Sequence, residues 1–273
     1  MLLPTHKNFC KPALRLIALT GVMLIAACAR PDPSMPTQDA FDPYEDQNRK
    51  VHEFNRGFDR ALIRPAAKGY SSAIPDDIET LIVRFSTNLS LPSDIVNSVL
   101  QLNMRGAIED TARLVVNTTV GLGGLFDPAS EMGMPAGTNA DFGQTLHAWG
   151  AREGAYVELP VLGPSTERDT WGIAVDLFTN PLSYLLESPE SLIGTGAGVA
   201  AGLSKRDKFS ETIDTILYES ADSYAQSRSI YLQNRRFELG GTSGSVYDDP
   251  YDTSADPYDT PATSATLEDP YDE

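Results

Sequence analysis

The clearest structural pattern in this chain is the stretch DDIETLIVRFSTNL, residues 76–89. Its large apolar side chains recur at three- and four-residue steps, which places them on one face of an α-helix. They are Ile78, Leu81, Ile82, Phe85 and Leu89. Pro75 precedes the stretch and two aspartates open it, as is typical of a helix N-terminus. The stretch therefore predicts an amphipathic helix.

Stripes of the same kind lie on both sides of this segment and predict an all-α domain. The stripe at 51–62 is expected to end at Arg64-Pro65, because the residue before a proline is pushed out of the helical conformation. Pro92-Ser93-Asp94 predicts the start of a separate helix that reaches Leu100. Further helices are predicted over about 105–120, 166–178, 181–186 and 208–236.

The helix predicted at 105–120 is expected to turn four apolar residues inward: Ile108, Ala112, Val115 and Val116. The glycine-rich run at 121–128 breaks the helical pattern. Residues 129–165 are predicted to be loop-rich, with one short strand-like piece at 155–159. Small residues dominate 189–203, and they would let a helix approach another backbone or lipid tails closely.

Residues 1–27 have the features of a secretory signal peptide. A basic segment precedes an apolar run at 16–27 that is too short to span a bilayer as a helix. The run ends in Ile25-Ala26-Ala27-Cys28, which resembles the lipobox of bacterial lipoproteins. That resemblance implies cleavage before Cys28 and acylation of this residue. The alternative is a plain signal peptide followed by a chance cysteine.

The mature chain would then start with a short tether. Residues 28–41 are polar and rich in proline, which is typical of an extended linker. Several acyl chains on Cys28 would make a stable membrane anchor without a spanning helix. Ala29 follows the cysteine, so the familiar aspartate that retains lipoproteins in the inner membrane is absent, and this favours the outer membrane.

Charge and residue inventory exclude several function classes. A formal net charge of -17 is unsuited to nucleic acid, which needs clustered basic residues. His52 and His147 lie in unrelated segments, without the spacing of a zinc site. The run 196–201 matches G-x-G-x-x-A, but no strand precedes it as a dinucleotide site requires. We therefore predict no metal, no cofactor and no catalytic residues.

The composition changes near residue 238. The segment 238–273 repeats Asp-Pro-Tyr-Asp at 249–252, 256–259 and 269–272. Many like charges and few aliphatic residues predict a disordered tail. It could serve as a docking tail with tyrosine anchors or as a solubilising extension.

A series of short motifs runs from residue 42 to about residue 235. Among them are Asp42-Pro43-Tyr44-Glu45, Asn48-Arg49, Arg64-Pro65-Ala66, Val96-Asn97, Arg113-Leu114-Val115-Val116-Asn117, Gly121-Leu122-Gly123-Gly124-Leu125-Phe126-Asp127, Asp141-Phe142-Gly143-Gln144-Thr145-Leu146, Tyr156-Val157-Glu158-Leu159-Pro160 and Arg168-Asp169. In this order and spacing they resemble the MlaA (VacJ) family of outer-membrane phospholipid-transport lipoproteins. The family's usual Gly-Phe is replaced here by Asp46-Gln47, and the acidic tail lies outside the pattern.

The resemblance implies an all-α domain at 42–237, a ring of amphipathic helices that lies in the membrane leaflet around a central amphipathic channel. It also implies a non-enzymatic function. Phospholipids misplaced in the outer leaflet would pass through the channel to a soluble periplasmic lipid-carrier protein. The implied location is the periplasmic face of the outer membrane, with a trimeric porin as a further partner.

Two groups of residues are candidates for contact with lipid. Gly121, Gly123, Gly124 and Phe126 could line or gate the lipid path, because this loop is both apolar and flexible in its backbone; the alternative is an apolar turn between core helices. Arg49, Arg56 and Arg60 could hold lipid phosphates near the membrane surface. Their alternative role is in ion pairs with neighbouring acids.

Two other functions remain open. One is a structural envelope lipoprotein that bridges the membrane and partner proteins through its acidic tail. The other is a lipid-modifying hydrolase. Bound phospholipid on the purified protein would separate transport from bridging, and intact rather than cleaved lipid would separate transport from hydrolysis.

Overall fold

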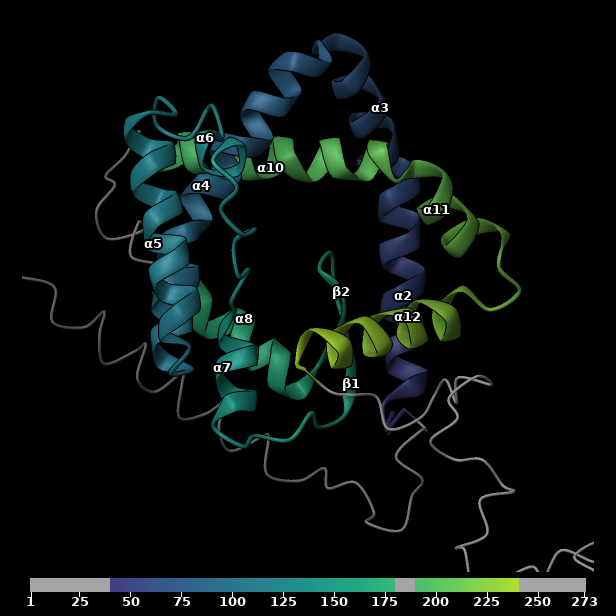
Figure 1. The fold of residues 1–273 in the computed structure, drawn as a ribbon. Helices are drawn as coiled ribbons and strands as arrows, with labels where there is room; N and C mark the ends of the chain where they lie inside the picture. The colour runs from purple at the N-terminus through teal and green to yellow at the C-terminus, as the bar shows by residue number, and fades with distance from the viewer. Residues whose placement is uncertain (1–39, 180–189, 241–273) are drawn as a thin grey trace, which may run out of the picture.

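The computed structural model describes residues 40–179 and 190–240 (Figure 1). The predicted signal peptide, Cys28, the helix at 181–186 and the acidic repeats lie outside the described residues. Within this part of the chain no helix is both long and apolar enough to cross a membrane.

Helices make up most of the described chain, as predicted. In chain order they are α2 (Glu45–Phe58), the π-helix η1 (Asp59–Ile63), α3 (Arg64–Ala73), α4 (Asp76–Leu100), α5 (Met104–Thr119), α6 (Pro128–Glu131), α7 (Phe142–Ala148), α8 (Glu167–Thr179), α10 (Glu190–Lys208), α11 (Ser210–Asp214), the π-helix η2 (Thr215–Glu219) and α12 (Ser223–Glu238). One antiparallel hairpin, β1 (Tyr156–Leu159) with β2 (Gly163–Thr166), interrupts them.

Figure 1 shows the helices following one another around a ring. α10 forms one side, α2 the next, and α12 crosses α2 at the following corner. α7 and α8 come next, and α4 with α5 completes the circuit back to α10. α3 and the beginning of α4 project beyond α10. The predicted all-α ring is confirmed.

The first predicted helix does not end at Arg64-Pro65. Arg64 is helical (φ -59°, ψ -50°) and the chain runs on through α3. The π-helix η1 precedes the proline, with the Arg64 N–H donating to the Asp59 carbonyl, five residues back. A wider turn of this kind relieves the crowding that a proline ring causes against the preceding turn.

Pro92 does not start a separate helix, since α4 is one helix of 25 residues with the proline inside it. Leu91, Asp94 and Asn97 around the proline are all buried. Packing of α4 against α5 and α10 therefore overrides the local preference of proline, which costs about 3 kcal/mol in a helix interior.

The helix predicted at 208–236 is broken. Ser220 is extended (φ -69°, ψ 143°), and Asp222 caps the new helix α12 by accepting a hydrogen bond from the Ala225 N–H at 3.0 Å. No glycine or proline marks this corner in the sequence, so the prediction missed it. The loop prediction for 129–165 also missed α6, α7 and β2, although the strand at 155–159 is confirmed as β1.

The buried apolar residues are small. Alanines supply much of the described core, and the larger buried apolar side chains include Leu91, Tyr156, Tyr224 and Leu232. The last three form one cluster between β1 and α12. Because few large apolar side chains are buried among the described residues, polar contacts hold much of the ring together.

Candidate functional site

The exposed face of α5 carries large apolar side chains. Ile108 and Val115 are 66% and 55% exposed, and Leu122 in the turn after the helix is 66% exposed. The expectation that Ile108 and Val115 face inward is therefore wrong, whereas Ala112 and Val116 are half-buried.

Large exposed apolar side chains occur on other helices as well. They include Phe54 on α2, Leu177 on α8, Leu192, Ile193 and Val199 on α10, and Phe237 on α12. Soluble monomers rarely expose apolar surface on this scale, so it indicates contact with lipid or a partner protein.

The buried face of α5 is polar. The Arg113 guanidinium donates to both oxygens of Asp127 at 3.0 Å, and the Asn117 amide donates to the same carboxylate at 3.0 Å. Burial acts to raise the pKa of Asp127, but hydrogen bonds from Ser130 and Asn117 and the charge of Arg113 hold that pKa below its ordinary value. Asp127 therefore ties the end of the glycine-rich turn to α5.

The turn at 121–126 combines buried glycines with an exposed aromatic ring. A Cβ on Gly121 would lie 2.4 Å from the Asn117 carbonyl oxygen, and one on Gly124 would lie 2.4 Å from Asn88 Cβ. Gly123 has a positive φ of 78° but open space around it, and Phe126 is 47% exposed. Gly121 and Gly124 are thus required for close packing, and the described surface of this turn is formed by apolar side chains.

Arg49 is engaged in contacts with acidic residues. Its guanidinium lies 2.8 Å from Glu45 and 2.9 Å from Asp222, and it also covers the ring of Tyr224. The hydrogen bonds from Arg49 and from the Ala225 N–H lower the pKa of Asp222 to about 2. Arg49 therefore joins α2 to the start of α12.

The other two candidate arginines differ from each other. Arg56 forms an exposed ion pair with Glu53 at 3.2 Å. Arg60 lies over the Tyr218 ring, 4.7 Å from its centroid, with no carboxylate within ion-pair distance among the described residues. Ion pairs, the alternative role, thus engage Arg49 and Arg56, while contact with lipid phosphate stays a prediction for all three.

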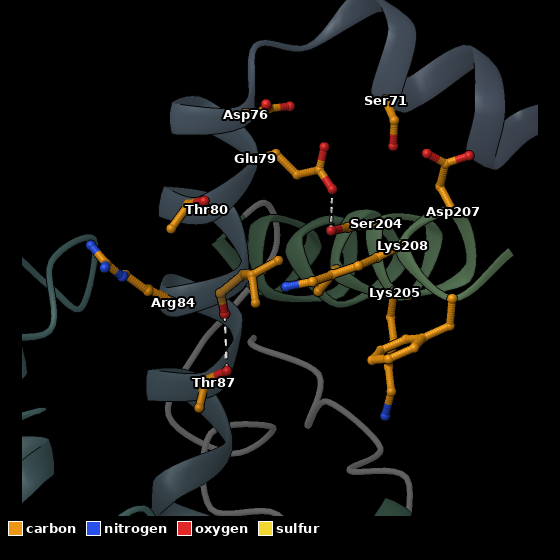
Figure 2. Close-up of a pocket in the computed structure, with 14 residues that line it drawn as sticks. Ser71, Asp76, Glu79, Thr80, Arg84, Thr87, Ser204, Lys205, Asp207 and Lys208 are labelled. Carbon is orange, nitrogen blue, oxygen red and sulfur yellow. Dashed lines mark hydrogen bonds between the residues drawn. The ribbon is translucent and has the colours of Figure 1, made fainter. Parts of the chain in front are cut away.

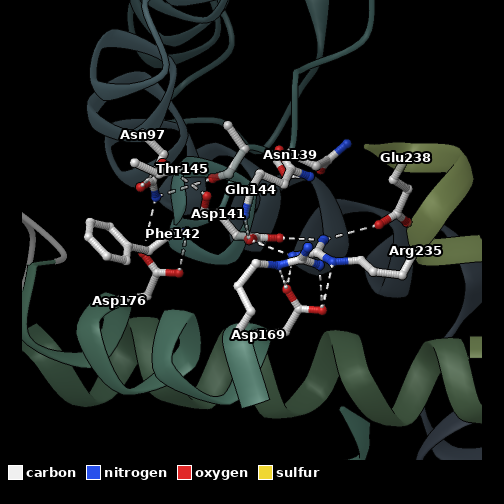
Figure 3. A network of polar contacts seen from close by, with 12 residues as sticks. Asn97, Asn139, Asp141, Phe142, Gln144, Thr145, Asp169, Asp176, Arg235 and Glu238 are labelled. Carbon is white, nitrogen blue, oxygen red and sulfur yellow. Dashed lines mark hydrogen bonds and ion pairs between the residues drawn. The ribbon is translucent and has the colours of Figure 1, made fainter. Parts of the chain in front are cut away.

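Arg235 links α12 to α7 and α8 (Figure 3). Its two terminal nitrogens each lie 2.7 Å from an oxygen of Asp141, and its Nη2 and Nε lie 3.2 Å from Asp169. Burial acts to raise the pKa of Asp169, but Arg168 and Arg235 hold it below its ordinary value. A Cβ on Gly143 would lie 2.6 Å from Asp169 Oδ1, so glycine is required here.

Asn97 of α4 links this helix to α7 and α8 (Figure 3). Its amide donates to Asp176 at 3.0 Å and to the Ala140 carbonyl at 3.3 Å, and it accepts from Thr145 at 3.1 Å. A Cβ on Gly172 of α8 would lie 2.3 Å from the Gly143 nitrogen of α7, so these two helices cross in direct backbone contact.

Arg206 joins α10 to η1. Its guanidinium donates to both oxygens of Asp59 at 2.8 and 2.7 Å and to Asp214 at 2.7 Å. Tyr218 donates to Asp59 at 2.6 Å, and burial together with this bond raises the pKa of Tyr218 to about 12. Arg64 pairs with Asp214 at 2.5 Å from the same corner.

His52 lies in a buried polar cluster between α2, β1 and α12. Its Nε2 is 3.0 Å from Ser223 Oγ and its Nδ1 is 3.3 Å from Glu158, which also accepts a hydrogen bond from Tyr156. Ser223 is 8% exposed, so its hydroxyl is shielded from any substrate. Among the described residues no group of His, Cys, Asp or Glu side chains could hold a metal ion.

The junctions of the ring are therefore polar, whereas many large apolar side chains are exposed on its surface. Sequence reasoning missed these junctions because it searched the polar residues for catalysis and not for packing. Their positions were nevertheless visible, since Asn48, Asn97, Arg113, Asp127 and Asp169 all belong to the short motifs noted in the sequence.

The described residues thus define a class of protein, a ring of helices with polar junctions and large apolar side chains on its surface. Comparison with known proteins gives the family. The chain belongs to the MlaA lipoprotein family, whose model matches residues 40–238.

Relatives of known sequence agree with this assignment. The intermembrane phospholipid transport system lipoprotein MlaA of Escherichia coli is 31% identical over 84% of this chain and 90% of its own length. The Haemophilus influenzae protein of the same name is 28% identical over 82% of this chain and 89% of its own length. An uncharacterized protein of Rickettsia typhi, RT0044, is 34% identical over 72% of this chain and 77% of its own length.

The fold agrees as well. A solved chain described under "Structural basis for maintenance of bacterial outer membrane lipid asymmetry" matches with a TM-score of 0.61 and 28% sequence identity. The match covers 72% of this chain and 98% of the solved one.

Proposed function

We propose that this chain removes phospholipids from the outer leaflet of the outer membrane and passes them to a soluble periplasmic carrier. In this role it is a lipid-anchored, non-enzymatic protein at the periplasmic face, held by acylated Cys28. Family membership and the names of the relatives in Escherichia coli and Haemophilus influenzae support the proposal.

The observation that carries the proposal is that polar and charged side chains are buried while large apolar side chains are exposed, the reverse of the arrangement in a soluble protein. The same helices that bury arginines, aspartates and asparagines at the junctions expose apolar residues such as Ile108 and Val115. A phospholipid has a charged head and apolar tails, so its path must be polar on one side and apolar on the other. Helices of this kind can supply both surfaces.

The turn at 121–126 is the part of the ring that we assign to the lipid tails. Leu122, Leu125 and Phe126 expose apolar surface there. Gly121 and Gly124 set its shape by close packing, and both Gly123 and Gly124 adopt a positive φ. The turn would line the lipid path, and any movement of its backbone would depend on Gly123.

Transfer of an intact lipid breaks no covalent bond, so it requires neither a nucleophile nor a metal. The Glu158–His52–Ser223 contacts contain the groups of a hydrolase triad, but all three side chains are buried in a junction of the ring. We assign them to structure and not to hydrolysis.

The partners follow from the proposed route. We propose a soluble periplasmic carrier as the acceptor of the cargo and a trimeric porin as a neighbour in the outer membrane. Arg60, which has no ion pair among the described residues, is the candidate arginine best placed to meet a lipid phosphate.

The test is the phospholipid content of the cell surface in a strain that lacks this protein. Phospholipid is expected to accumulate there, and the wild-type gene is expected to reverse the accumulation where a Cys28→Ala gene does not. A surface phospholipid content equal to that of the parent strain would contradict the proposal and leave the bridging function.

A further inference from the structure

A pocket of about 820 Å³ lies between α3, the first part of α4 and the end of α10 (Figure 2). None of the residues predicted from the sequence to contact lipid belongs to it. Its volume is typical of sites for small ligands. Val83, Ala201 and Phe209 give it an apolar portion, and the rest of its wall is polar or charged.

One half of the pocket is acidic. Figure 2 shows the carboxylates of Asp76, Glu79 and Asp207 on the same side of it, around the hydroxyl of Ser71. Glu79 accepts a hydrogen bond from Ser204, which joins α4 to α10 across the pocket. The Ser71 hydroxyl oxygen is buried and has no hydrogen-bond partner in the described part of the chain.

The other half is basic. Lys205 and Lys208 come from α10, and in Figure 2 the ammonium of Lys208 reaches toward α4 while that of Lys205 points away from the three carboxylates. Neither lysine has a carboxylate within ion-pair distance among the described residues, whereas Arg113, Arg206 and Arg235 are all paired. Arg84 on α4 also lines the pocket and has no ion pair among the described residues, so three cations there are available to an anion.

We propose that this pocket binds the head group of a zwitterionic phospholipid, with the phosphate at Lys205 and Lys208 and the ammonium at Glu79 and Asp76. The proposal rests on the proposed function and adds a preference among lipids to it. Val83 and Phe209 would take the first methylene groups of the lipid.

The two halves together determine this choice of ligand. An anionic head group without an ammonium would find the lysines but would place its remaining polar atoms beside three carboxylates. A simple cation would find the carboxylates but would leave the lysines unpaired. Only a ligand with both charges is complementary to both halves, and complementarity of this kind produces specificity.

The experiment uses the purified full-length chain in detergent micelles that contain equal amounts of phosphatidylethanolamine and phosphatidylglycerol. The protein is captured, and mass spectrometry measures the two bound lipids. The wild type is expected to hold several-fold more phosphatidylethanolamine. Glu79→Gln, which keeps the shape of the side chain, is expected to bring the ratio of the two lipids close to one.

The lysines are tested in the same way. The double variant Lys205→Ala, Lys208→Ala is expected to lower the total bound lipid at least fivefold. Lys50→Ala removes an exposed positive charge on α2, outside the pocket, and is expected to change neither quantity. Thermal unfolding of each variant checks that the fold is retained.

The outcomes separate the pocket from the transport function. The pocket proposal alone is overturned if the wild-type chain binds phospholipid but the variants behave like it. This means that Glu79→Gln leaves the ratio of the two lipids unchanged, or that the double lysine variant leaves the total bound lipid unchanged. A wild-type chain that binds no phospholipid overturns the proposed function and this proposal together.

Discussion

Arg235 shows at the scale of single residues how this ring is held. It contacts Asp141, Asp169 and Glu238, and Asp169 is 4% exposed. Replacement of the arginine would leave the buried Asp169 carboxylate with Arg168 as its one remaining arginine partner and would remove the partner of Asp141, and the loss of a partner from a buried charge is costly.

We expect Arg235→Met to lower the free energy of unfolding by about 3–5 kcal/mol. Chemical unfolding in detergent measures this change. Arg105→Met is the matched control, because Arg105 is highly exposed and pairs with Glu109 on the surface, where such pairs contribute little to stability. Equal effects of the two substitutions would contradict the structural role of Arg235.

Asp94 is expected to make stability depend on pH. Burial and then the charge of Asp110 raise its pKa to about 7, whereas an unfolded aspartate titrates near 3.9. The folded state therefore retains a proton that the unfolded state releases, and the free energy of unfolding falls as the pH rises from about 4 to 7.

Asp94→Asn removes this titration and is expected to stabilise the protein at pH 8 by about 2–4 kcal/mol, with little change at pH 4. Unfolding curves at the two pH values measure the difference. Asp77→Asn, at an exposed position on the same helix, is the control. An identical pH dependence in both variants and the wild type would show that Asp94 does not carry the effect.

At the scale of elements, the turn after α5 separates two reasons for a glycine. Gly124 has a φ of 95° and no room for a Cβ beside Asn88, whereas Gly123 has a φ of 78° and open space. Gly123→Ala thus tests backbone conformation alone, and Gly124→Ala tests conformation and packing together.

We expect Gly123→Ala to cost about 1–2 kcal/mol of stability and Gly124→Ala to cost clearly more. Chemical unfolding gives both values. If the two variants are equally stable, close packing of the turn on α4 is not important, and the turn would be looser than the structure indicates.

The exposed face of α5 predicts a membrane-binding surface. A glutamate at position 108 or 115 would replace an apolar side chain whose transfer from water contributes about 1.5–3 kcal/mol. We expect Ile108→Glu and Val115→Glu each to weaken vesicle binding at least tenfold in flotation assays.

The same substitutions are expected to leave the melting temperature in detergent within a few degrees, because both positions are exposed. Gln226→Glu adds the same charge at an exposed position on α12 and serves as the control. Vesicle binding of the α5 variants that equals that of the control would show that α5 does not face lipid.

At the scale of the whole molecule, the apolar exterior predicts a dependence on amphiphiles. The purified chain is expected to aggregate when detergent is removed and to stay dispersed when phospholipid vesicles replace the detergent. Light scattering measures the difference. A monodisperse chain without detergent or lipid would mean that the exposed apolar residues are covered within the protein.

Part of the ring could be predicted from apolar periodicity, because α2, α4 and α5 each carry an apolar stripe, whereas α10, where small residues dominate, was not predicted in this way. Periodicity could not predict the direction in which such a stripe points, because the pattern is the same whether the stripe packs against a core or against lipid. For this reason α5 was placed correctly while Ile108 and Val115 were given the wrong direction.

The positions of the breaks between helices were also predicted wrongly from the sequence. The sequence predicts a helix end at Arg64-Pro65 and a helix start at Pro92, but a π-helix accommodates the first proline and tertiary packing the second. Conversely, the corner at Ser220 carries no local breaker and depends on the Asp222 cap and its contact with Arg49, which lies far away in the sequence. The pocket could not be predicted at all, because α4 and α10 come together only in the folded ring.

The small size of the buried apolar residues has a consequence for temperature. Exposure of buried apolar surface is the main source of the heat-capacity increase on unfolding, and the described core of this chain consists largely of alanines and polar contacts. We therefore expect an unusually small heat-capacity change per residue. A small change flattens the curve of stability against temperature, so the ring would keep nearly constant stability from cold to warm conditions.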